Sequence, residues 1–199
     1  REVILKKADE ITSTLKSLPY DNIGTVEMLM GQDGSFSFLE MNTRLQVEHG
    51  VSEEISGIDL VAAQVRSASG ESVDDIIPAD VAVNGHAIQA RVYAEDPIKF
   101  FPSPGPLNKF RLPECEGIRI ETGFAEGMAV TPYYDPMVAK VLSKGKDRDD
   151  AIEKLIGALE KFEIEGIKSN IPALVQILRS DDFRSGDVHT GLTAEIIQK

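Results

Sequence analysis

Several features that would assign this sequence to other protein classes are scarce or missing. A single cysteine, Cys115, excludes a framework of internal disulfide bonds and fits a reducing compartment. No apolar run reaches the roughly 18 residues that a membrane-spanning helix needs, and no secretory signal is present. The 21 basic residues are outnumbered by 33 acidic ones, and a net charge of −12 argues against a general nucleic-acid-binding protein. We therefore expect a cytoplasmic protein that binds neither membranes nor nucleic acid.

The glycines also form neither of two common phosphate-binding loops, because G-x-x-x-x-G-K and G-x-G-x-x-G are both missing. What remains is typical of a soluble globular protein, with 42% hydrophobic and 27% charged residues. A chain of 199 residues can form one domain or two small ones. The mixed, proline-containing stretch between Asp74 and Gly85 is a plausible boundary between two domains.

The most informative stretch runs from Phe38 to His49 and alternates strictly between apolar and polar residues. In an extended strand, successive side chains point to opposite faces, so one face would be entirely polar. The polar members are Glu40, Asn42, Arg44, Gln46 and Glu48. Carboxylates, carboxamides and a guanidinium on one face suit the binding of a metal, an anion and a proton.

A hairpin precedes this face, because Asp33-Gly34 separates two short apolar runs. If Asp33 and Gly34 form the turn, Glu27 lies directly opposite Glu40, and such like-charged pairs are destabilising. A divalent cation between the carboxylates would relieve the repulsion, with Asn42 as a third oxygen ligand suited to Mg²⁺ or Mn²⁺. The alternative is a hairpin with two exposed acids and no ion.

The rest of the sequence predicts an α+β fold. Helical periodicity opens the chain and stops at Pro19, and a further helix is expected from Ser56 or Asp59 to Ser69. Short strands are expected over 87–93, 107–112, 118–121 and 137–142, followed by helices over 148–161 and 171–179.

Beyond these patterns, the segment Glu40-Met-Asn-Thr-Arg-Leu-Gln-Val-Glu-His49 resembles the signature of the biotin carboxylase family of ATP-grasp ligases. The family includes the carboxylase parts of acetyl-CoA, propionyl-CoA, methylcrotonyl-CoA and pyruvate carboxylases. The similarity continues through His86–Pro97, Phe101–Gly105, Pro132–Met137 and Gly166–Asn170, and so spans nearly the whole chain. Departures are small: Gly50 replaces a usual proline, and Ser52 replaces a usual threonine.

The resemblance implies roles for individual residues. Metal ligands for two Mg²⁺ or Mn²⁺ ions would be Glu27, Glu40 and Asn42. Bicarbonate would be bound by Arg44, Gln46, Val47 and Glu48, with Arg44 catalytic and Glu48 the general base. Arg91 would bind biotin and stabilise its enolate during carboxylation. The nucleotide would contact Glu27, Leu29, Glu40 and Val188, although Leu29 and Val188 are equally good core residues.

By the same resemblance, residues 1–80 are the C-terminal portion of an ATP-grasp domain and residues 85–197 a biotin carboxylase C-terminal domain. The chain would then be an incomplete, inactive part of an enzyme that uses ATP and bicarbonate to carboxylate biotin on a carrier protein or domain. A carboxyltransferase would pass the carboxyl group to an acyl-CoA or pyruvate, as in acetyl-CoA carboxylase and fatty acid biosynthesis. The intact enzyme would be a homodimer, although Glu116 stands where a dimeric bacterial relative has an aromatic residue.

Three alternatives remain open. A urea carboxylase shares this chemistry, and a carbamoyl-phosphate synthetase relative shares the paired metal carboxylates. A non-catalytic interaction module would share the fold without the reaction.

Overall fold

The computed structural model describes residues 2–197 and is α+β, as predicted, with antiparallel strands throughout the described sheets. The chain forms two compact units. The first contains the chain up to His49 together with Ile58–Val81, and the second contains Gly50–Gly57 and the chain from Ala82 onward. None of the helices in residues 2–197 combines the length and apolar character needed to cross a membrane.

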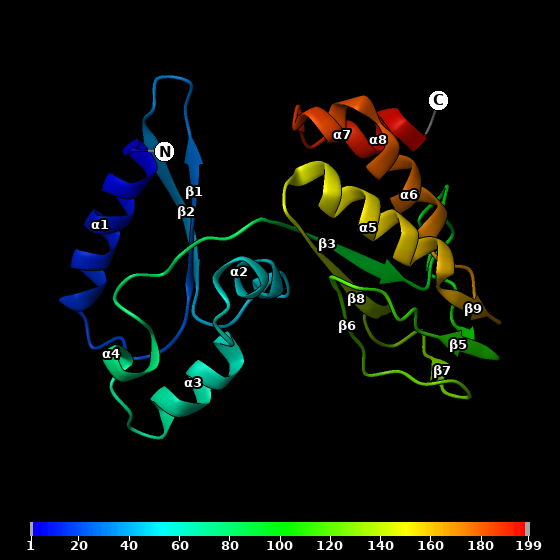
Figure 1. Ribbon diagram of the computed structural model, residues 1–199, viewed down its shortest axis with the longest axis horizontal. Helices are drawn as coiled ribbons and strands as arrows, with labels where there is room; N and C mark the ends of the chain where they lie inside the picture. The colour runs from blue at the N-terminus through cyan, green and yellow to red at the C-terminus, as the bar shows by residue number, and fades with distance from the viewer. Residues whose placement is uncertain (1, 198–199) are drawn as a thin grey trace. The chain divides into compact units, whose positions relative to one another are not determined.

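The first unit is built on one hairpin, and Figure 1 shows α1 running beside it. Its elements are α1 (Glu2–Lys16), β1 (Thr25–Met30), β2 (Phe36–Asn42), α3 (Leu60–Ala68) and α4 (Val73–Ile76). Ile11 and Leu15 of α1 line an apolar groove with Val26, Met28 and Phe38 of the hairpin. The helix therefore presents its apolar stripe to the strands, as its 3.6-residue period requires.

The hairpin reaches the predicted pairing of Glu27 with Glu40 by a different route. Its turn has three residues between Gly31 and Ser35, because the Gly31 N–H donates to the Ser35 carbonyl at 2.9 Å. A longer turn shifts the register by one residue, so Met28 pairs with Phe38. A β-bulge then places Leu39 as an extra residue on β2 and restores the Glu27–Glu40 pair. The two departures from the predicted hairpin offset each other.

The prediction of one continuous strand from Phe38 to His49 is wrong beyond Asn42. There β2 ends, and residues 43–48 form an irregular loop that leads into α2 (His49–Ser56). Of the two predicted starts of the following helix, Ser56 is wrong, because Ser56 ends α2 and its hydroxyl donates to the Ser52 carbonyl. The other predicted start is observed, because Asp59 caps α3 by accepting a hydrogen bond from the Ala62 N–H at 2.7 Å.

The second unit has a central three-stranded sheet in the order β3–β8–β6, with α5 across one face (Figure 1). The strands are β3 (His86–Tyr93), β6 (Ile118–Glu121) and β8 (Met137–Gly145). The helices are α5 (Arg148–Lys161), α6 (Ile171–Arg179), α7 (Asp181–Ser185) and α8 (Leu192–Ile197). Two short strand pairs complete it: β4 (Gly105–Pro106) with β7 (Ala129–Val130), and β5 (Lys109–Arg111) with β9 (Glu163–Glu165).

The core of this unit lies between the sheet and α5. Val92 and Val141 from the sheet and Leu155 and Leu159 from α5 are at most 1% exposed. Each such side chain contributes roughly 1.5–3 kcal/mol through its burial. The opposite face of the sheet carries charged side chains in register, namely Arg91, Lys140, Arg119 and Glu121. The core thus fixes a rigid sheet that presents a polar face.

Candidate active site

Two facing carboxylates lie at the open end of the hairpin in the first unit. Glu27 is half-buried on β1 and pairs with the exposed Glu40 on β2. The Asn42 side-chain nitrogen donates to the Glu27 carboxylate at 2.9 Å and to the Glu40 carboxylate at 3.1 Å. One amide group therefore bridges two acids from neighbouring strands, and all three predicted metal ligands come together.

Two residues of the following loop turn back toward this group. The Gln46 side-chain amide donates to the same Glu27 oxygen at 2.8 Å. The exposed Arg44 guanidinium lies 3.4 Å from the Asn42 side-chain oxygen and 3.3 Å from the Leu45 carbonyl. The loop, and not the predicted strand, therefore brings Gln46 to the Glu27 carboxylate and Arg44 to the Asn42 amide.

The loop ends in a turn that contains Val47 and Glu48. Val47 is half-buried and Glu48 is exposed. His49 closes the turn, since its backbone N–H donates to the Gln46 carbonyl at 3.2 Å and its ring nitrogen Nδ1 lies 2.7 Å from the same oxygen. These bonds close the turn that contains the predicted bicarbonate-binding residues Val47 and Glu48.

The donor set at Glu27, Glu40 and Asn42 fits a hard divalent cation. Two carboxylates and one carboxamide oxygen supply oxygen ligands alone, which Mg²⁺ accepts while keeping water or phosphate oxygens in its shell. The Asn42 NH₂ group now lies between the acids, and a half-turn of the amide would present its oxygen instead. The residues present therefore suit the metal that the resemblance implies.

In the second unit, Arg91 is half-buried on the polar face of β3. Its partner across the strand pair is Lys140 of β8, whose side chain is 12% exposed and lies 2.5 Å from Glu121 of β6. Burial works against ionisation of Glu121, but Lys140 and then Arg119 hold its pKa below the ordinary value. Two cationic side chains, Arg91 and Lys140, thus occupy paired positions on neighbouring strands, and the Glu121 carboxylate offsets the charge of Lys140.

Arg119 extends this polar row toward Gly50–Gly57 of the same unit. Its guanidinium pairs with Glu121, with the buried Glu53 at 2.7 Å and with Glu54 at 3.5 Å. Burial acts to lower the pKa of Arg119, but the Glu53 and Glu121 carboxylates raise it above its ordinary value. The Arg119 guanidinium is therefore paired with acidic side chains of its own chain, whereas Glu116 is exposed.

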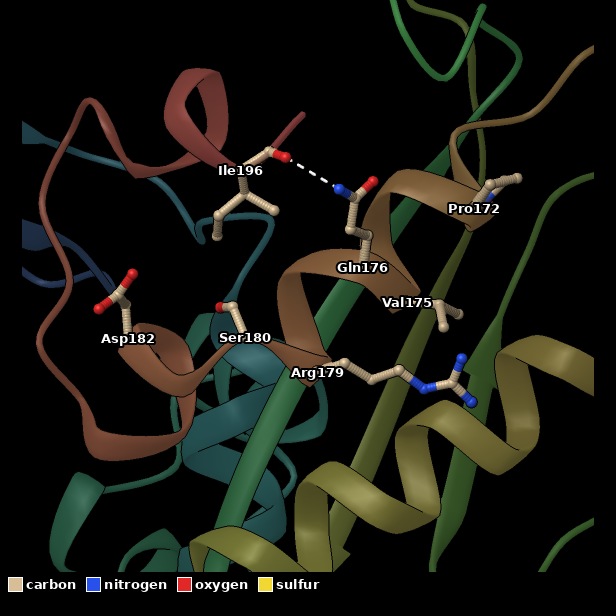
Figure 2. A pocket seen from close by; sticks show the side chains of 7 residues that line it. All are labelled: Pro172, Val175, Gln176, Arg179, Ser180, Asp182 and Ile196. Carbon is tan, nitrogen blue, oxygen red and sulfur yellow. Dashed lines mark hydrogen bonds between the residues drawn. The ribbon is translucent and has the colours of Figure 1, made fainter. Parts of the chain in front are cut away.

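The predicted nucleotide contacts Leu29 and Val188 are 62% and 53% exposed. Their exposure contradicts the alternative interpretation of both as core residues. Neither lines the surface pocket of about 520 Å³ among α6, α7 and α8 in Figure 2. Two of the polar side chains in that pocket are already bonded, as Gln176 donates to the Ile196 carbonyl and Arg179 pairs with Glu160.

Sequence reasoning missed two residues beside the predicted ones. Lys140 could have been found from the register of β3 with β8, but it has no motif of its own. Asn170 donates from its side chain to the Arg91 carbonyl at 3.1 Å, across 79 residues of sequence. It lies in a segment that resembles the family, but no local pattern linked it to Arg91.

Two sequence families match the chain. Residues 89–195 match the biotin carboxylase C-terminal domain, and residues 1–76 match the ATP-binding domain of the carbamoyl-phosphate synthase L chain. Biotin carboxylase 2 of Bacillus subtilis is 48% identical over 189 residues, which cover 95% of this chain and 42% of that protein. The biotin carboxylase of Halalkalibacterium halodurans is 51% identical over 175 residues, or 88% of this chain and 38% of that protein.

Solved structures agree with these sequences. The biotin carboxylase subunit of a pyruvate carboxylase superposes with a TM-score of 0.82 at 44% identity, over 87% of this chain and 39% of that one. The biotin carboxylase domain dimer of Hydrogenobacter thermophilus 2-oxoglutarate carboxylase, solved with MgADP, ADP and bicarbonate, gives 0.80 at 39% identity. That match covers 86% of this chain and 38% of the solved one.

This chain spans about two-fifths of the length of these relatives. The ATP-binding match covers the first part of the chain and the biotin carboxylase C-terminal match the second part, in the order expected from the sequence. The chain therefore belongs to the biotin carboxylase family of ATP-grasp ligases.

Proposed function

We propose that this chain carries the metal-binding, bicarbonate-binding and biotin-facing residues of a biotin carboxylase. The enzyme would use ATP to activate bicarbonate as carboxyphosphate and then carboxylate the ureido nitrogen of biotin. The observation that carries the proposal is the convergence of Glu27, Glu40, Asn42, Arg44 and Gln46 at one end of the hairpin. This cluster joins an oxygen ligand set to an anion-binding guanidinium, which phosphoryl transfer to a small anion requires.

At the hairpin, Glu27, Glu40 and Asn42 would hold two Mg²⁺ or Mn²⁺ ions. Bound there, divalent cations would neutralise the negative charge of the ATP phosphates during phosphoryl transfer. The MgADP bound by the 2-oxoglutarate carboxylase relative supports Mg²⁺ for this group. Leu29, exposed on the same hairpin, and Val188 would contact the nucleotide base.

In the loop after β2, Arg44 would orient bicarbonate through its planar, bidentate guanidinium. Gln46 is already fixed by its bond to Glu27, and its carbonyl is held by His49. Together with the backbone of Val47, it would supply the remaining contacts to bicarbonate. Glu48 would accept the bicarbonate proton, so that a bicarbonate oxygen can attack the γ-phosphate and ADP can leave.

In the second unit, Arg91 would stabilise the negative charge that develops on the ureido oxygen of biotin, as an oxyanion-binding group does. Lys140 lies across the strand pair from Arg91, with its own charge offset by Glu121. Biotin would arrive on a carrier protein or domain, and a carboxyltransferase would select the final acceptor. The dimeric biotin carboxylase domain among the relatives supports a homodimer, and we place the enzyme in the cytoplasm.

The match of residues 89–195 to the biotin carboxylase C-terminal domain favours this reaction over that of a carbamoyl-phosphate synthetase relative. The test is ADP release by the gene product that carries this sequence, with bicarbonate and free biotin each added or omitted. Turnover that requires bicarbonate and rises with biotin supports the proposal. ATP consumption that ignores both would assign the site to another ATP-grasp ligase, and a folded product without turnover would favour a non-catalytic module.

A further inference from the structure

Beside Arg91, at the edge of β3, lies a buried polar side chain to which the reaction above assigns no role. Asn170 is only 6% exposed, yet it carries a full carboxamide. Its Nδ2 donates to the Arg91 carbonyl at 3.1 Å, and its Oδ1 accepts from the Tyr93 N–H at 2.9 Å. Its own backbone N–H donates to the Tyr93 carbonyl at 3.2 Å.

These three bonds imitate a neighbouring strand. β3 lies at the edge of its sheet, so the outward-facing backbone groups of Arg91 and Tyr93 have no strand partner there. The Asn170 carboxamide offers one donor and one acceptor in the geometry of a peptide group. It therefore supplies hydrogen-bond partners to the outer edge of β3 at Arg91 and Tyr93.

The edge needs this support at that position. The β3–β8 register shifts between Val92 and Tyr93, where Val138 is an extra residue on β8. A bulge leaves part of the ladder unpaired and bends the strand locally. The backbone next to Arg91 is therefore held less firmly from the β8 side, and Asn170 holds it from the other side.

Asn170 is itself held in place by the packed helix α6. It is the N-cap of α6, but its side chain makes no capping bond to that helix and is used on β3 instead. Ala173, Val175 and Leu178 anchor α6 in the buried core. An N-cap asparagine normally satisfies its own helix, so this orientation gives up a local bond for a distant one.

The segment before Asn170 bonds to the chain that follows β3. Lys168 pairs with Asp96 at 2.8 Å, and its backbone N–H donates to the Ser103 hydroxyl at 3.0 Å. Glu95, between Tyr93 and this pair, lies beside the Asn170 amide; burial raises the pKa of its carboxyl, which Asn170 partly counteracts. The stretch from Arg91 to Asp96 is thus tied at several points to one short segment.

We propose that Asn170 is a positioning residue, which holds the backbone of β3 so that the Arg91 guanidinium meets the developing negative charge on biotin. This inference rests on the proposed function of Arg91. A displacement of about 1 Å at a reacting group can lower a rate by roughly a hundredfold. Loss of the Asn170 bonds therefore impairs the transfer of the carboxyl group to biotin more than the activation of bicarbonate.

The test uses the gene product with Asn170→Ala, with Asn170→Asp, and with Asn84→Ala as an exposed asparagine control in the same unit. The first readout is hydrogen exchange of the Tyr93 amide. The second is the amount of carboxybiotin formed per ADP released, which partial unfolding does not change because it removes both activities together.

For Asn170→Ala we expect Tyr93 exchange to rise at least tenfold and the carboxybiotin-to-ADP ratio to fall at least tenfold. Asn170→Asp keeps the acceptor for Tyr93 and loses the donor to Arg91, so the ratio falls while Tyr93 stays protected. Asn84→Ala leaves both readouts within twofold of the wild type. In an Arg91→Ala background, Asn170→Ala lowers the ratio by less than twofold further, because both changes remove the same interaction.

Two results would overturn the inference while the proposed function stands. One is a wild-type ratio in Asn170→Ala despite rapid Tyr93 exchange. The other is an undiminished effect of Asn170→Ala in the Arg91→Ala background, which would mean that Asn170 does not act through Arg91. A wild-type protein that forms no carboxybiotin would instead overturn the proposed function, and this inference with it.

Discussion

We expect the Glu27–Glu40 pair to lower the stability of the metal-free protein and to support metal binding. Glu40→Gln should change both properties in opposite directions. The two carboxylates accept hydrogen bonds from one Asn42 nitrogen. Acceptors of one trigonal NH₂ group lie about 5 Å apart. At an effective dielectric constant near 20, two unit charges at that distance repel by about 3 kcal/mol. Because Glu40 is exposed, solvent reduces this repulsion to about 0.5–1 kcal/mol.

Glu40→Gln removes the repulsion and keeps an oxygen that can accept from Asn42. Without metal, we therefore expect the variant to melt about 1–4 °C above the wild type. With Mn²⁺ and ADP at about a hundred times the dissociation constant, the wild type gains about 2.7 kcal/mol of stability. The variant has lost a ligand and gains much less, so the order of the two melting temperatures reverses.

The assay is thermal unfolding of the gene product in metal-free buffer and across a Mn²⁺ titration with ADP. Asp9→Asn, an exposed acid on α1, controls for the general benefit of lowering a net charge of −12. A Glu40→Gln protein that is less stable than the wild type without metal, and equally stabilised by Mn²⁺, would refute the reasoning. Calorimetric titration should show the same loss of Mn²⁺-nucleotide affinity.

Three further changes test other parts of the site and fold. Arg44→Ala should lower biotin carboxylation by about 10²–10³-fold with a melting temperature within about 1 °C of the wild type, since Arg44 is exposed; normal turnover would remove its assigned role. The pKa of the Asp96 carboxyl is far below its ordinary 3.8, because Lys168 and then the Lys99 and Ile98 amides bond to the carboxylate. The contribution of Asp96 to folding stability is therefore present above pH 3.8 and is lost as the pH falls toward the folded pKa. The difference in urea midpoint between the wild type and Asp96→Asn should therefore narrow below pH 3.8, and a constant difference would contradict this. Gly166→Ala should destabilise the second unit by roughly 1–3 kcal/mol in urea unfolding, because its φ of +101° favours glycine and a Cβ would lie 2.0 Å from the Pro106 carbonyl; an unchanged midpoint would disagree.

Elements with strong local signals were predictable from the sequence. The bounds of α5, α6 and β6 are those predicted, and Asp147 caps α5 by accepting from the Asp150 N–H. The short strand β9 was missed, because its three residues are extended only through pairing with β5. The helix α2 was missed because the alternation from Phe38 suggested a strand through His49. Chain reversal after Asn42 depends on contacts such as Gln46 with Glu27, which span 19 residues.

The candidate site shows the same division. The pairing of Glu27 with Glu40 followed from turn chemistry and is observed, although two local errors cancelled to give it. The positions of Arg44 beside Asn42 and of Gln46 beside Glu27 result from a loop and could not follow from strand alternation. Asn170 and Lys140 reach the surroundings of Arg91 through sheet edge and sheet register, which single-sequence patterns do not contain.

The central claim is that bicarbonate attacks the γ-phosphate of ATP at this site, and its most direct test follows one oxygen atom. The gene product would be given ATP, biotin and ¹⁸O-labelled bicarbonate, and the inorganic phosphate would be analysed by mass spectrometry before the label exchanges with water. If carboxyphosphate forms, one bicarbonate oxygen remains on phosphorus, so the account predicts about one ¹⁸O per phosphate released with ADP. Phosphate without label, formed while biotin is carboxylated, would contradict it.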